Sequence, residues 1–109
     1  MLLVSVGGLK LKSWPRAARF FRATYRAYKQ AKCADGCVHV DLFRAEGRYF
    51  VISVWETPRN MAHYAKSGVH KEAMARAFET TKEARNFCFA AKAVPTRKKS
   101  LEMWKSGAK

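Results

Sequence analysis

Residues 48–55 read RYFVISVW, and nearly every position in this stretch is apolar. A strand with one face in water alternates apolar and polar residues, because successive side chains point to opposite faces of the sheet. Here both faces are apolar, so both sides of the sheet should be covered. We expect the helices of this chain to cover one side and a second copy of the chain to cover the other, which predicts a homodimer.

The first half of the chain predicts two further elements and a turn. A strand is expected over 2–11, and the glycines in its middle indicate a bulge or the close approach of another group. Pro15 begins a helix that reaches Lys32, in which Tyr25 and Tyr28 belong to the apolar face and the arginines and lysines form a basic outer stripe. A strand over 38–43 and a turn over 45–47 then lead into the apolar strand.

The second half predicts two helices, a strand and a final helix. Thr57 is suited to cap a helix that begins at Pro58 and ends near Lys66. Ser67-Gly68 interrupts it, and Ser67 caps a longer helix with an apolar face that extends to Thr81. A fourth strand is expected over 86–94, with Phe87 and Phe89 on one face. Residues 96–105 are expected to form a last helix.

The element order is β-α-β-β-α-β. This order is typical of a ferredoxin-like α+β fold, with two crossover helices on a four-stranded antiparallel sheet. We expect residues 1–109 to form one domain, with 96–109 as a C-terminal helix or tail. A hydrophobic content of 49% excludes a disordered chain.

The charge balance is strongly basic. Twenty-two Lys and Arg stand against eight Asp and Glu, for a formal net charge of +14. Such a field attracts anions, so nucleic acid, acidic lipid and a carboxylate or propionate ligand are all candidate partners. A solvated basic surface with no dedicated partner explains the same charge, and composition alone does not separate these alternatives.

The three cysteines do not have the spacing of a metal site. Cys33 and Cys37 flank three residues, and no second pair accompanies them. An odd number of cysteines in a short chain indicates reduced thiols, and hence a cytoplasmic protein. The apolar start has no charged region before it, so it is not a signal peptide, and no apolar run is long enough to span a membrane.

One segment carries a resemblance to a known family. VWETP at 54–58, a helix with Met61 and Tyr64, and KSGVHKEAM at 66–74 resemble the antibiotic-biosynthesis-monooxygenase-like proteins. The resemblance implies a dimeric α+β barrel, in which two ferredoxin-like sheets face each other. It also implies oxygenation of an aromatic substrate without a cofactor. The spacing from Trp55 to His70 resembles the spheroidene-monooxygenase-like branch.

The haem-degrading members of this superfamily use an asparagine, a tryptophan and a histidine at three defined places. The first place falls near Gly7-Gly8 in this chain, the second on Tyr64 and the third on Met74. All three depart from that pattern, so haem degradation is not implied.

Four residues form the candidate site. His70 follows the predicted cap Ser67 by three positions, where the positive end of the helix dipole favours a neutral imidazole. It can accept a proton or ligate a metal, or it can simply pack at the helix entrance. Trp55 and Tyr64 can form an aromatic wall with Met74 as a filler, although aromatic residues at this spacing also occur in ordinary cores.

The leading hypothesis is a pocket between sheet and helices that binds, and as a monooxygenase oxidises, a hydrophobic planar or aromatic ligand. No cofactor is expected, because the substrate supplies the electrons, and His70 handles the proton. One alternative is a basic nucleic-acid-binding module, since RNA-recognition modules share this topology. The other is haem or porphyrin binding without degradation, with His70 as axial ligand and the cations on the propionates.

Overall fold

The computed structural model describes residues 1–11, 22, 25–66, 71 and 81–107. Its centre is a four-stranded sheet in the order β2-β3-β1-β4, in which all neighbouring strands are antiparallel. The strands are β1 (Leu2–Leu11), β2 (Cys37–Ala45), β3 (Arg48–Trp55) and β4 (Thr81–Ala91). This order confirms the ferredoxin-like α+β fold, and β1 and β3 have the bounds that the hydrophobic pattern predicts.

A tight turn joins β2 to β3. Glu46 has φ 52° and Gly47 has φ 75°, which are the two successive positive values that a two-residue hairpin turn requires. Gly47 takes this conformation without steric cost. The turn confirms the predicted hairpin, and it makes Phe43 the cross-strand partner of Phe50, with ring centroids 5.5 Å apart.

The fourth strand begins earlier than the pattern predicts. Residues 81–85 belong to β4 and pair with the second half of β1, so the predicted helix does not extend to Thr81, and β4 ends at Ala91. Lys82, Glu83 and Ala84 have little intrinsic preference for strands. The ten residues of β1 offer a complete edge for pairing, and this tertiary context overrides local propensity.

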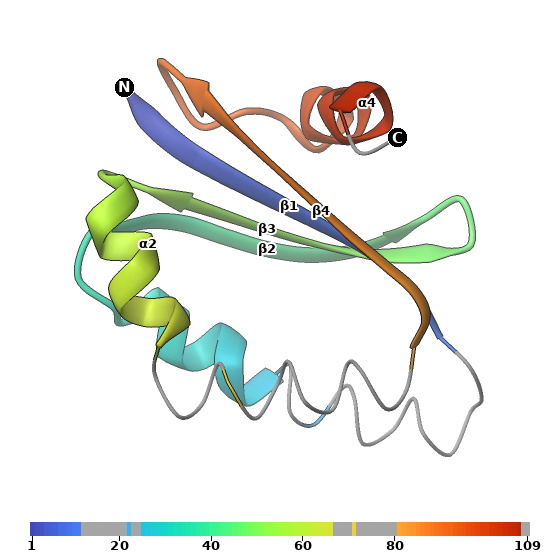
Figure 1. Ribbon diagram of the computed structural model, residues 1–109, viewed down its shortest axis with the longest axis horizontal. Coiled ribbons are helices and arrows are strands. Elements are labelled where there is room, and N and C mark those ends of the chain that lie inside the picture. The colour runs from blue at the N-terminus through green and yellow to red at the C-terminus, as the bar shows by residue number, and fades with distance from the viewer. Residues whose placement is uncertain (12–21, 23–24, 67–70, 72–80, 108–109) are drawn as a thin grey trace.

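Helices lie on both sides of the sheet (Figure 1). One side carries α2 (Pro58–Ala65) and the helical residues 25–32, and the other carries α4 (Arg97–Gly107). The expectation that the chain has helices for only one side was therefore wrong. The final helix was predicted, but its position on the second face was not.

The helical residues 25–32 present a different face to the sheet than expected. Ala27 and Ala31 are buried, whereas Tyr25 is exposed over 59% of its surface. The Lys29 ammonium lies 5.6 Å from the centre of the Tyr25 ring. The small alanines let the helix approach the sheet closely, and the larger ring remains outside. The predicted helix residues 15–21 and 23–24, and 67–70 and 72–80 of the following helix, lie outside the described residues.

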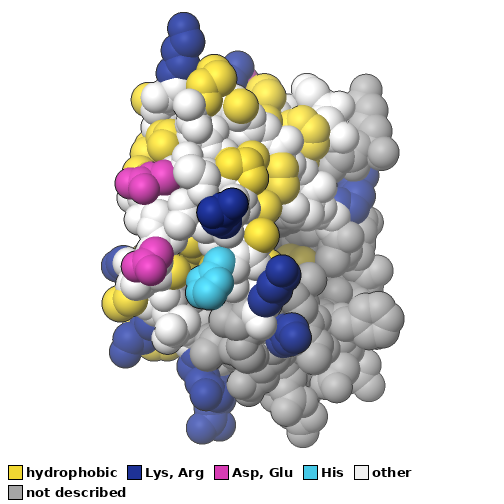
Figure 2. Space-filling view, turned by 60° about the vertical axis from the view of Figure 1, so that its left-hand side comes forward, with side chains coloured by type: hydrophobic (Ala, Val, Ile, Leu, Met, Phe, Trp, Pro, Cys, Tyr) yellow, Lys and Arg dark blue, Asp and Glu magenta, His cyan; other side chains and the backbone are white. Residues whose placement is uncertain are grey.

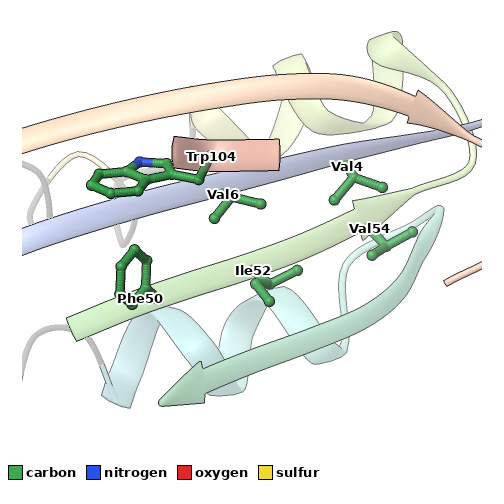
Figure 3. Packing of buried hydrophobic residues seen from close by; sticks show 6 residues of the cluster. All are labelled: Val4, Val6, Phe50, Ile52, Val54 and Trp104. Atoms are coloured by element: carbon green, nitrogen blue, oxygen red, sulfur yellow. The ribbon is translucent and has the colours of Figure 1, made fainter. Parts of the chain in front are cut away.

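Among the described residues, a hydrophobic core cluster lies between the sheet and α4 (Figure 3). β1 and β3 contribute five side chains from one face of the sheet, and α4 contributes one indole. All six are at most 4% exposed. They are Val4, Val6, Phe50, Ile52, Val54 and Trp104. The same face of β4 adds Phe87 and Phe89, which were predicted to share a face.

Gly8 makes room for the indole of Trp104. A Cβ atom at this position would clash with the Trp104 ring and would lie 2.9 Å from Cε1 of Phe50. The Trp104 and Phe50 rings meet edge to face, with centroids 5.0 Å apart. Trp104 also donates from Nε1 to the carbonyl of Arg85 at 3.0 Å. The close approach that a glycine in β1 predicted is therefore the docking of α4.

An ion pair holds the start of α4 over β2. Arg97 donates from Nε and Nη2 to the two carboxylate oxygens of Asp41, at 2.6 and 2.8 Å. These hydrogen bonds, together with the guanidinium charge, lower the pKa of Asp41 despite its partial burial. The pair joins residues 56 positions apart, so sequence spacing could not reveal it.

We expect Asp41→Asn to destabilise the protein at neutral pH and to have no effect in strong acid. Because the folded pKa lies below the ordinary 3.8, the pair's contribution is fully present above that value. It is lost as the pH falls through the lower folded pKa. Urea unfolding of both proteins between pH 2 and pH 7 measures the difference. A difference that grows on acidification would contradict this assignment.

Candidate functional site

Trp55 is the last residue of β3 and is completely buried. It pairs with Leu3 of β1 on one side and with Cys37 of β2 on the other. Its side chain points away from the core cluster beneath α4 and toward α2. Of the predicted site residues, Trp55 therefore lies on the side of the sheet that carries α2.

The link from β3 to α2 is fixed by local hydrogen bonds. The Thr57 hydroxyl accepts from the backbone N–H of Asn60 at 3.2 Å, and Pro58 occupies the first turn, so the predicted cap is confirmed. The backbone N–H of Glu56 donates to the carbonyl of Gly36 at 2.8 Å. These bonds fix the direction in which α2 leaves the sheet, and hence the position of Tyr64.

Trp55 and Tyr64 lie together, as the spacing predicted. Their ring centroids are 5.3 Å apart and the ring planes are inclined by 30°. The Tyr64 hydroxyl donates to the carbonyl of Ala27 at 2.7 Å, which ties α2 to the helical residues 25–32. The two rings pack against each other, and the Tyr64 hydroxyl holds the pair in place.

The indole nitrogen of Trp55 is buried. Among the residues that the structure describes, its N–H has no hydrogen-bond acceptor. A buried N–H without a partner costs about 1–3 kcal/mol. Indole N–H groups usually find a partner when they are buried. A carbonyl or phenol oxygen on a bound molecule would satisfy this donor.

Two titratable groups at this ring pair, the Tyr64 phenol and the Cys37 thiol, are held protonated. Burial raises the pKa of the Tyr64 phenol, and the nearby Cys37 adds to the effect. Burial also raises the pKa of the Cys37 thiol, with a backbone hydrogen bond of His39 acting in the opposite direction. Both groups are therefore neutral at neutral pH, and neither is suited to accept a proton there.

Two of the four predicted site residues, His70 and Met74, lie outside the described residues. His39 and His63 are described, and both are exposed on the surface. Within the described ranges, no group of three His, Cys, Asp or Glu side chains could hold a metal ion. The three thiols are free, with Cys33 and Cys88 exposed.

Two hollows accompany α4 on the other side of the sheet. One has a volume of about 210 Å³ and is lined by Trp104 and the basic residues Arg48, Arg85 and Lys105. The second is an open groove beside the end of β4, where Met1 and Val94 are exposed. Figure 2 shows hydrophobic side chains gathered in the upper part of the side that contains the N-terminus. Sequence reasoning did not anticipate either hollow, because each combines strands with α4.

None of the described helices is both long and apolar enough to cross a lipid bilayer.

The fold recurs in several solved structures. Protein Rv0793 of Mycobacterium tuberculosis superposes with a TM-score of 0.78 at 10% identity, covering 88% of this chain and all of its own. A conserved protein of Methanosarcina mazei superposes with a TM-score of 0.76 at 14% identity. The match covers 84% of this chain and 94% of the Methanosarcina chain. SnoaB, a cofactor-independent oxygenase from Streptomyces nogalater, superposes with a TM-score of 0.71 at 16% identity. The match covers 85% of this chain and 95% of SnoaB.

A search of curated proteins finds no match. The family model for antibiotic biosynthesis monooxygenase matches residues 15–76, which is more than half of the chain. This segment contains all four residues of the predicted site. The chain therefore belongs to the antibiotic biosynthesis monooxygenase family.

Proposed function

We propose that this protein binds a hydrophobic planar or aromatic molecule against Trp55 and Tyr64 and oxidises it with dioxygen, without a bound cofactor. The observation that carries the proposal is the buried indole N–H of Trp55 beside the ring of Tyr64. A flat ligand would pack on apolar surface and accept this hydrogen bond through an oxygen substituent. His70 and Met74 complete the proposed site from the same family-matched segment.

The proposed reaction needs no external reductant when the substrate carries an activated CH₂ group. Loss of a proton gives an electron-rich carbanion, which can transfer electrons to dioxygen. One oxygen atom becomes the carbonyl of the product, and the other leaves as water with the two hydrogens of the CH₂ group. The protein contributes burial, orientation and a proton acceptor.

His70 is the proposed proton acceptor. Tyr64 and Cys37 are protonated at neutral pH, and the Tyr64 hydroxyl already donates to Ala27. Position 70 follows the predicted helix cap closely, where a neutral imidazole is favoured. SnoaB, a cofactor-independent oxygenase with a similar fold, supports this class of chemistry. A homodimer is also proposed, on the basis of the family resemblance.

We expect His70→Ala to abolish oxidation of an anthrone while leaving the melting temperature nearly unchanged. An anthrone is a planar probe with one activated CH₂ group, and its conversion to the quinone is followed by absorbance. A residue that faces a site contributes little packing, so stability should hardly change. If His70 is structural, stability should instead fall by about 1–3 kcal/mol.

Trp55→Phe is the matched variant for binding. It replaces the indole by a phenyl ring, which is still aromatic but has no N–H to donate. Anthrone binding should weaken, while His70→Ala should affect turnover more than binding. Unchanged anthrone affinity in Trp55→Phe would show that the indole does not contact the ligand. Binding and turnover that persist in both variants would refute the proposed site.

A further inference from the structure

A second site lies on the opposite face of the sheet, far from Trp55 in the fold. Its pocket has a volume of about 210 Å³. Four separate elements build it: the β2–β3 turn provides Glu46, β3 provides Arg48, β4 provides Arg85, and α4 provides Lys105 together with Trp104. The pocket therefore exists only while α4 is docked on the sheet.

Two guanidinium groups converge on one indole in this pocket, which Lys105 also lines. The guanidinium carbon of Arg85 lies 5.0 Å from the Trp104 ring centre, and that of Arg48 lies 5.8 Å from it. A guanidinium that stacks on an aromatic ring still presents its N–H edge, and this edge matches a carboxylate or phosphate. The indole thus orients both arginines at the same pocket.

One acidic side chain belongs to the described lining of the pocket. It is Glu46, and it pairs with Lys105 at 2.6 Å. Both side chains of this pair are about half exposed, with 51% for Lys105 and 54% for Glu46. An exposed pair of this kind is weak, so Lys105 can turn to another anion at little cost.

The pocket has room for a small organic anion. Its volume of about 210 Å³ is more than one phosphate or carboxylate group needs. Trp104 and Phe50 supply apolar lining beside the charged groups.

We propose that the pocket formed by Arg48, Arg85, Lys105 and Trp104 binds a small organic anion through its phosphate or carboxylate group. Because α4 supplies two of these residues, the bound anion holds α4 against the sheet. Anion binding and the docking of the C-terminal helix are then thermodynamically linked, and the ligand stabilises the folded protein by mass action.

The test is calorimetric titration of the full chain with phenyl phosphate and with benzoate, and with benzyl alcohol as the neutral comparison. We expect at least one of the two anions to bind in a saturable manner, to bind more weakly as salt increases, and to raise the melting temperature. The anion that binds identifies phosphate or carboxylate as the preferred group. Benzyl alcohol that binds as tightly as the anions would overturn the proposal.

Arg48→Gln and Arg85→Gln should each weaken binding of the preferred anion about tenfold or more, since each removes a charge-assisted hydrogen bond. Arg59→Gln is the matched control, because Arg59 is exposed on α2 and has the same charge. Equal affinity in all three variants would overturn the proposal. If an arginine variant fails to fold, the half-exposed Lys105→Gln supplies the same measurement.

Trp55→Phe and His70→Ala should bind the anion as the unmodified protein does. This separates the anion pocket from the proposed oxidation site, so either can fail while the other stands.

Discussion

Ile52→Glu is expected to leave no folded protein at neutral pH. Ile52 is 2% exposed in the middle of β3, between the sheet and α4. A carboxylate there has neither water nor a cationic partner among the described core residues, and an unpaired buried charge is among the most destabilising of substitutions. The sequence alone did not decide which face of β3 the helices of the chain cover and which face meets a second copy. Because Ile52 belongs to the core cluster with Trp104 of α4, the substitution should disrupt the fold itself.

Circular dichroism and denaturant unfolding of purified Ile52→Glu measure this effect. Val38→Glu is the matched control, because Val38 lies on β2 but is 44% exposed, and its replacement should change stability only slightly. An Ile52→Glu protein that unfolds cooperatively at nearly the same denaturant concentration as the unmodified chain would show that α4 does not cover this part of the sheet.

Trp104→Ala should lower the free energy of unfolding by about 3–5 kcal/mol, the range for removal of a large buried aromatic side chain. Trp104 is 4% exposed and fills the space above Gly8. The substitution removes its edge-to-face contact with Phe50 and its hydrogen bond to the Arg85 carbonyl. A domain of this size has only about 5–15 kcal/mol of stability, so the loss is a large fraction of the total.

Urea unfolding monitored by circular dichroism gives the free energy for both proteins. Glu102→Ala serves as the control in the same helix, since Glu102 is exposed. A loss below about 1 kcal/mol in Trp104→Ala would mean that the indole contributes little to the core, contrary to its burial. Protection of α4 amides from hydrogen exchange should fall in parallel.

The candidate site was predictable to the extent that it depends on short-range spacing. Trp55 and Tyr64 are nine residues apart across one capped helix start, so their contact follows from the strand end, Thr57 and Pro58. The bond from Tyr64 to Ala27 spans 37 residues and was not predictable. Nor could the sequence show that the indole N–H of Trp55 lacks an acceptor among the described residues, because this depends on which groups the fold brings near the indole.

The errors arose where one sequence pattern is compatible with two environments. Tyr25 has helical spacing with other apolar residues, yet smaller alanines occupy the buried face and Tyr25 is exposed. Lys82, Glu83 and Ala84 suit a helix in isolation, but they pair with β1 as part of β4. In both cases the tertiary surroundings outweighed a local preference of less than about 1 kcal/mol per residue.

Local pattern determined β1, β3, the β2–β3 turn and α2, because side-chain periodicity, capping and positive φ values depend on neighbours within a few residues. The antiparallel ferredoxin-like order followed from the succession of these elements. Only the tertiary structure decided that α4 covers the second face of the sheet. That docking depends on Gly8 beneath Trp104 and on Asp41 beside Arg97, contacts between residues far apart in the chain. Such contacts arise from the shape and charge of folded surfaces, which no periodicity in the sequence records.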